Sequence, residues 1–69
     1  MFNRYELEKA YKGVGLSVPD FTQALGIVMH TWYRKMESKT DWKLSESQTI
    51  LRLLREHGWK GEKDDIFPM

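Results

Sequence analysis

The chain has no cysteine among its 69 residues, so no disulfide can stabilise it. A zinc site would need His30 and His57 with carboxylates, but these two histidines lie too far apart in sequence for ligand spacing. We therefore expect no metal site and no cofactor. No apolar run approaches the roughly 18 residues of a membrane span, and the start of the chain shows no signal-peptide pattern. These absences predict a soluble, cytoplasmic protein with no membrane partner.

A charge excess of one sign is also missing. Lys and Arg number 11 against 10 Asp and Glu, a formal net charge of +1, which is weak for a nucleic-acid binder. Residues 29–43 are mildly basic and residues 60–69 mildly acidic. The chain has no Gly-rich phosphate loop and no catalytic set, because its acids and serines are explained as helix-surface charges and caps. We expect no enzymatic activity and no small-molecule substrate.

What the chain does contain is enough apolar material for a folded core. Hydrophobic residues make up 41% and aromatic residues 13% of the sequence. A chain of this length forms one small domain, which buries only about 60% of its unfolded surface. Strand-like alternation, repeats, linkers and low-complexity tracts are missing. The sequence therefore predicts a single all-α domain over residues 1–69.

Hydrophobic periodicity and cap residues predict four helices and one short terminal turn. Asn3 and Glu6 have capping-box spacing, Ser17 caps the second helix with Asp20 at its third position, and Ser45 pairs with Gln48. The expected ranges are 4–12, 18–25, 28–37 and 45–57, with a turn over 64–67. The residues expected to face the core, or to lie near it, are Leu7, Ala10, Tyr11, Val14, Phe21, Ala24, Leu25, Ile27, Val28, Trp32, Met36, Trp42, Ile50, Leu51, Leu53, Leu54 and His57.

The most informative segment is residues 21–36, where Gly26 ends one amphipathic helix and another starts almost at once. This is the layout of a helix-turn-helix, which we place at about residues 17–37. In such a motif the second helix is free to enter a DNA major groove. Its start is unusual here, because Val28 has no side-chain oxygen to cap the helix.

The residues around this segment carry a family resemblance. The run 21–27, Phe-Thr-Gln-Ala-Leu-Gly-Ile, precedes a helix and then Lys39, Trp42, Ser45 and a Leu-rich helix. This layout resembles the lambdoid repressor and Cro class of helix-turn-helix proteins, and more closely the short Cro-like proteins of phages and prophages of Gram-positive bacteria. It covers roughly residues 4 to 67. The sequence departs from the family pattern at Thr22, where Ala is usual and whose hydroxyl needs a partner, and at Val28, where Ser or Thr is usual.

The resemblance implies a compact four- to five-helix, repressor-like fold and a transcriptional regulator that binds operator DNA in the bacterial cytoplasm. It places base contacts at the outward side chains of helix 28–37, which are Met29, His30, Tyr33 and Arg34. Arg34 is the strongest candidate, because its guanidinium can bond guanine O6 and N7 together. Expected phosphate contacts are Ser17, Thr31, Lys35, Lys39, Thr40 and Lys43.

Since one recognition helix contacts few base pairs, we expect a homodimer on a two-fold site. Residues 59–69 are the candidate dimer surface, because Trp59, Ile66, Phe67 and Met69 are many apolar groups for a tail. The alternative is that they fold back onto the core of their own chain. A second hypothesis for function is a protein-interaction module on a helix-turn-helix scaffold that has lost DNA binding. It would use Met29, Tyr33 and the tail.

Overall fold

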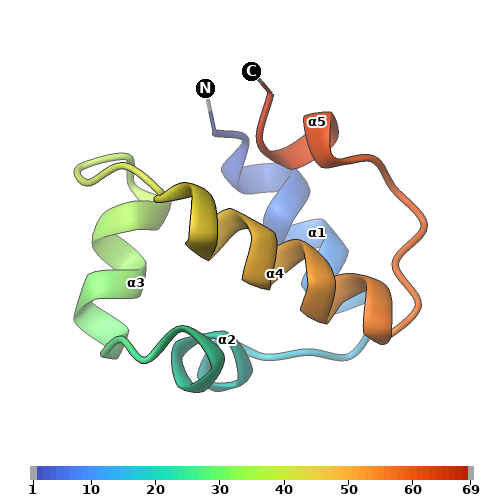
Figure 1. Ribbon diagram of the computed structural model, residues 1–69, viewed down its shortest axis with the longest axis horizontal. Coiled ribbons are helices and arrows are strands. Elements are labelled where there is room, and N and C mark those ends of the chain that lie inside the picture. Colours follow the sequence, from blue (N-terminus) through green and yellow to red (C-terminus); the bar gives the residue numbers. More distant parts are fainter. Residues whose placement is uncertain (1, 69) are drawn as a thin grey trace.

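The computed structural model describes residues 2–68, and within that range it contains five helices and no strand. The helices are α1 (Arg4–Gly13), α2 (Val18–Leu25), α3 (Met29–Met36), α4 (Leu44–Glu56) and α5 (Lys63–Ile66). In Figure 1, α4 crosses the front of the molecule, α1 lies behind it, and α3 stands at one side above α2. α2 packs against both α3 and α4, and α5 packs against α1. The prediction of a small all-α domain is confirmed.

Aromatic rings from four parts of the chain form the centre of the core. Trp32 of α3 and Phe21 of α2 are fully buried and stacked, with their ring centroids 5.3 Å apart. The edge of Trp42 meets Trp32 at 5.3 Å, and Phe67 lies 6.0 Å from Trp42 on its other side. Such ring pairs add about 0.5–1.5 kcal/mol each beyond the area they bury. They join α2, α3, the loop before α4 and the C-terminal segment into one core.

Three residues expected in or near the core lie at the surface instead, namely Ala24, Val28 and His57. Val28 is 67% exposed because it is the extended residue before α3, so its side chain does not follow the helical line of Trp32 and Met36. His57 follows the last turn of α4, where its ring Nδ1 lies 3.0 Å from the carbonyl oxygen of Leu53. The other expected core residues are buried or packed against the core.

The helix starts follow two of the three predicted caps. The side chain of Asn3 accepts a hydrogen bond from the amide of Glu6 at 3.1 Å, and Ser17 precedes α2 as expected. The predicted pair of Ser45 and Gln48 is wrong. α4 begins one residue earlier, and the amide of Lys43 donates to the carboxylate of Glu46 at 2.8 Å. The same carboxylate of Glu46 also pairs with the buried ammonium of Lys35.

The C-terminal segment folds back onto the core of its own chain. Ile66 is fully buried and Phe67 nearly so, and the carbonyl of Ile66 accepts a hydrogen bond from the amide of Asn3 at 2.8 Å. The two ends of the chain therefore lie side by side (Figure 1). Trp59 is partly buried against the same core, and Met69 lies outside the described residues. The apolar groups that suggested a dimer surface at 59–69 are thus largely used within the monomer.

Candidate nucleic-acid interface

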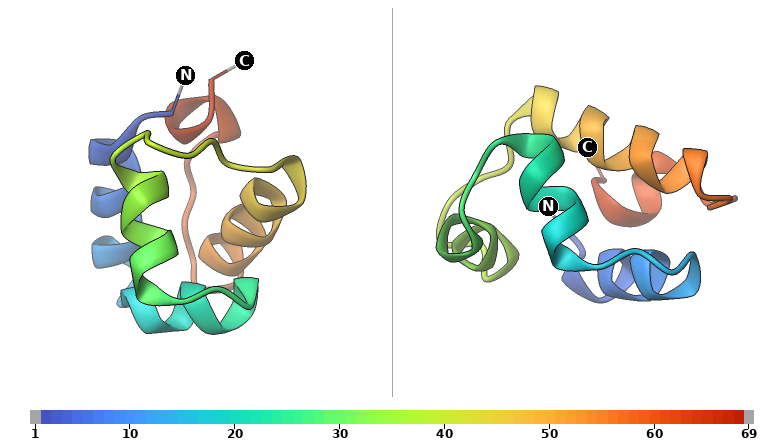
Figure 2. Two further views of the ribbon diagram at one scale, coloured as in Figure 1. Left: turned by 90° about the vertical axis from the view of Figure 1, so that its left-hand side faces the viewer. Right: turned by 90° about the horizontal axis from the view of Figure 1, so that it is seen from below.

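Three residues, 26 to 28, connect α2 to α3 in a tight turn. Gly26 has φ +70°, in the left-handed region that favours glycine, and the amide of Ile27 donates to the carbonyl of Thr22 at 3.1 Å. Thr22 also finds the partner its hydroxyl requires, because Oγ1 donates to the carbonyl of Pro19 at 3.1 Å. This turn sets α3 across the end of α2 (Figure 2). On the inner side of α3, Trp32 stacks on Phe21 of α2.

α3 lies at the outside of the molecule. The left view of Figure 2 looks directly onto it, with α1 and α4 on either side and behind. Its inward residues are Trp32, Lys35 and Met36, all nearly or fully buried. At 3.6 residues per turn, the opposite side of the helix carries His30 and Arg34, and the flank beside them carries Met29 and Tyr33. All four predicted base-contact residues are therefore at the surface.

Two rows of side chains run along this outward side. His30 and Arg34, four residues apart, form what we call the polar row, and both are exposed. Met29 and Tyr33 form the apolar row beside it, and their side chains are 45% and 46% exposed. Thr31 lies on the other flank and is partly buried. The structure thus brings hydrogen-bonding and apolar groups together on one short helix.

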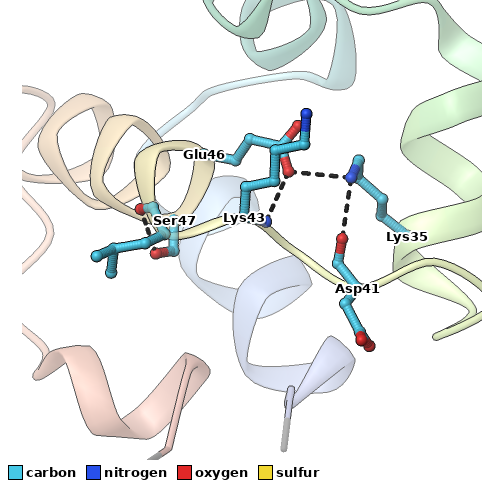
Figure 3. A network of polar contacts seen from close by, with 6 residues as sticks. Lys35, Asp41, Lys43, Glu46 and Ser47 are labelled. Atoms are coloured by element: carbon cyan, nitrogen blue, oxygen red, sulfur yellow. Dashed lines mark hydrogen bonds and ion pairs between the residues drawn. The ribbon is translucent and has the colours of Figure 1, made fainter.

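Lys35 was expected to contact phosphate, and the structure contradicts this because its side chain is only 3% exposed. Figure 3 shows its ammonium directed at the loop before α4 and at the first turn of α4. Nζ donates to the carbonyl of Asp41 and lies 3.0 Å from Glu46 Oε1, and it also lies over the ring of Trp42. These contacts satisfy the charge inside the protein, so Lys35 cannot reach a ligand.

The sequence does contain a signal for this, because the buried line of the helix can pass through Lys35 as an alternative to Met36. Lys35 follows the buried Trp32 by three residues and adjoins the buried Met36, so it belongs to the inward side of the helix. An inward Lys requires a buried acceptor, and Glu46 supplies it from the start of the next helix. Lys35 and Glu46 therefore fix the end of α3 to the start of α4.

The carboxylate of Glu46 is held in its charged form by this arrangement. Burial by itself raises the pKa of Glu46, but the amide of Lys43 and the ammonium of Lys35 more than offset it, so the pKa lies below its ordinary value of 4.5. A carboxylate with a lowered folded-state pKa stabilises the fold above its unfolded pKa. That stabilisation is lost as pH falls through the folded pKa.

We therefore expect the free energy of unfolding to decrease below about pH 4.5, and to decrease less steeply in Glu46→Gln, which has no proton to gain. Urea unfolding followed by circular dichroism at pH 7 and at pH 3 measures how much free energy of unfolding each protein loses. Equal losses in the two proteins would show that Glu46 contributes nothing to the acid sensitivity.

Ser17 is the second predicted phosphate contact that the structure disfavours. Its amide and its hydroxyl both donate to Asp20 Oδ2, at 2.8 and 3.0 Å. The amide and then the hydroxyl of Ser17 lower the pKa of Asp20, so this carboxylate remains charged at neutral pH. The start of α2 therefore already holds an anion, which repels a phosphate, and we remove Ser17 from the candidate site.

Lys39, Thr40 and Lys43 lie in the loop between α3 and α4, and all three are exposed as expected. Lys39 is 3.6 Å from Glu37 in an ion pair whose members are 65% and 50% exposed, so its ammonium can exchange that partner for another anion. The loop begins at the end of α3, where Ser38 takes the left-handed conformation with φ +61°. Lys39 and Lys43 thus add two exposed cations beyond the last turn of α3, among the exposed acids Glu37 and Asp41.

One surface feature was not predicted. An open hollow of about 460 Å³ lies between the chain ends and the start of α4, and it is lined by Phe2, Asp41, Trp42, Leu44, Ser47, Phe67 and Pro68. Leu44 is 68% exposed beside it. The aromatic residues cluster here because distant segments of the chain come together, so no local sequence pattern predicts the hollow.

Within residues 2–68 no helix is long and apolar enough to cross a membrane, and no three or more His, Asp or Glu side chains gather into a metal-binding group. Comparisons of the chain with protein-family models, with curated proteins and with solved structures found no match.

Proposed function

We propose that this protein binds double-stranded DNA by placing α3 in the major groove, and that it regulates transcription as a repressor- or Cro-type protein of a phage or prophage. The observation that carries the proposal is the exposed pair of rows on an outlying helix that follows a three-residue turn. An eight-residue helix is about 12 Å long, comparable to the roughly 12 Å width of the major groove. The resemblance to short Cro-like proteins supports the same reading.

The polar row supplies the groups suited to base edges. The guanidinium of Arg34 can donate two parallel hydrogen bonds to O6 and N7 of guanine, and His30 can donate to a guanine acceptor or to phosphate. α3 contains no acidic residue that would repel the DNA backbone. Lys39, Thr40 and Lys43 follow α3 and are exposed, so they can meet phosphates, and Thr31 can meet one from the flank of α3 opposite the apolar row.

The proposal includes a homodimer on a two-fold operator, because one short helix contacts only a few base pairs. It no longer relies on the C-terminal tail, since Ile66 and Phe67 are buried in the monomer. It assigns the protein no catalytic activity and no cofactor.

The test uses an operator selected from a random duplex library by repeated binding. We expect Arg34→Ala to weaken binding to this operator by about 1–3 kcal/mol, or roughly 5- to 150-fold, because one bidentate base contact is lost. The fold should be unchanged, since Arg34 is exposed. Fluorescence anisotropy with labelled DNA measures the affinity, and the slope against salt concentration counts the phosphate contacts.

Lys60→Ala is the matched control, because it also removes one exposed cation but lies in the loop between α4 and α5, away from α3. Its operator affinity should differ little from that of the parent. If Lys39→Ala reduced sequence discrimination more than Arg34→Ala, the placement of the recognition helix would be wrong. The proposal fails outright if no DNA binds at low salt with the protein at high micromolar concentration.

One observation favours the second candidate, a protein-interaction module. Val28, Met29 and Tyr33 expose large apolar surface at the same end of α3, as a protein-binding patch does. Absence of DNA binding, together with loss of binding to a partner protein in Met29→Ala, would support this candidate.

A further inference from the structure

We propose that the apolar row of α3, Met29 and Tyr33, reads the C5-methyl groups of thymines in the operator, while Arg34 of the polar row reads guanine. This inference rests on the proposed function, since it names what that same helix recognises. It predicts a half-site in which a guanine lies next to one or two thymines. Met29 and Tyr33 become specificity-determining residues.

The geometry of α3 puts the two kinds of group beside each other. Met29 and Tyr33 lie one turn apart on the flank that adjoins His30 and Arg34. Base pairs that contact one row therefore lie next to the other row as well.

The chemistry of the row selects its ligand within the groove. The thioether of Met29 makes no strong hydrogen bond, so it gains little from base acceptors or donors. On the major-groove edges of the base pairs, the methyl group of thymine is the apolar feature. About half of each side chain is exposed in the free protein, so both have surface to bury against such a group. Val28, 67% exposed just before the helix, adds a further apolar contact at the same end.

Charge complementarity favours DNA over a protein partner for this row. The apolar side chains share their helix with exposed Arg34 and with no acidic residue. In the segment that follows, exposed Lys39 and Lys43 alternate with exposed Glu37 and Asp41, so this surface carries a small excess of positive charge. A mildly positive surface with an apolar row matches the major groove, where thymine methyl groups lie between two phosphate backbones. The hydrogen-bonding capacity of Arg34 also needs acceptors nearby, and purine edges provide them.

The experiment replaces each thymine of the selected operator, one at a time, by deoxyuridine, which removes only the methyl group. We expect the affinity of the full-length protein to fall roughly three- to five-fold at one or two positions, the change produced by uncovering one methyl-sized group. Met29→Ala should bind the thymine and deoxyuridine operators equally at the position that Met29 contacts. Circular dichroism of the variant establishes that its fold is unchanged.

Two further variants separate the apolar row from its neighbours. Arg34→Ala should bind more weakly to every operator but keep the discrimination between thymine and deoxyuridine, because it leaves the apolar row intact. Tyr33→Phe should also keep it, since the ring, and not the hydroxyl, makes the contact.

The failures of this inference and of the proposed function are distinguishable. If the protein binds the operator but every deoxyuridine substitution leaves the affinity unchanged, the methyl reading is overturned and DNA binding stands. If discrimination survives in Met29→Ala at every position, Met29 is not the reader and the inference is overturned. If the protein binds no DNA at low salt, both are overturned, and the exposed row belongs to a protein interface.

Discussion

Replacing Lys35 by Ala should destabilise the protein by about 3–5 kcal/mol, the usual result of removing one member of a buried ion pair. The carboxylate of Glu46, only 12% exposed, would lose its cation, and the carbonyl of Asp41 would lose the ammonium donor. A domain of this size has a total free energy of unfolding of about 3–10 kcal/mol. The variant should therefore be partly or wholly unfolded at room temperature, which urea titration followed by circular dichroism measures.

Lys39→Ala is the matched control for this prediction. It removes the same side chain from an ion pair with Glu37 that lies at the surface, so its free energy of unfolding should change by less than about 1 kcal/mol. The double variant Lys35→Met with Glu46→Leu should recover much of the stability, because it leaves no unpaired charge in the core. If Lys35→Ala proved as stable as Lys39→Ala, the ion pair would not hold α3 against α4.

The second large effect is expected for Trp32→Ala, which should destabilise the fold by about 3–5 kcal/mol. Trp32 is fully buried and contacts Phe21 on one side and Trp42 on the other, so its removal leaves a cavity at the junction of α2, α3 and the following loop. A loss of this size approaches the whole stability of the domain. The cooperative urea transition should disappear, or its midpoint should fall sharply.

Trp32→Phe provides the graded comparison. The phenyl ring keeps the stacking on Phe21, and the change removes an indole Nε1–H that has no hydrogen-bond partner among the residues the structure describes. Leaving such a group buried costs about 1–3 kcal/mol, so its removal offsets part of the lost packing. We expect a loss below about 2 kcal/mol. A loss as large as that of Trp32→Ala would mean that indole volume, and not ring stacking, determines stability here.

The positions of the helices were readable from local sequence. Gly26 ends α2 because its left-handed conformation is one that glycine adopts without strain. Asn3 starts α1 by accepting from the amide of Glu6, and Ser17 starts α2 with its amide and hydroxyl on the carboxylate of Asp20. Residue 28 was also correctly read as lacking a side-chain cap. These features depend on neighbouring residues alone, which is why spacing and residue type were sufficient.

The composition of the candidate site was only partly readable. Periodicity put Met29, His30, Tyr33 and Arg34 on the outside of α3, because Trp32 and Met36 define the buried side of the same helix. The same periodicity puts Lys35 on the inward side, but a lysine is acceptable inside only if another part of the chain supplies an acceptor, which the local pattern does not contain. The acceptor, Glu46, lies eleven positions along the chain and in the next helix.

The sequence by itself determined the number and order of the helices, their ends to within a residue or so, and which side of each is apolar, because capping and the 3.6-residue period act over a few residues. Only the tertiary structure decided that Lys35 is paired inside and that Ile66 and Phe67 complete the core of the monomer. Each of these depends on a contact between segments distant in sequence. The free energy of burying a group is fixed by the partners it meets there, and a local pattern does not contain them.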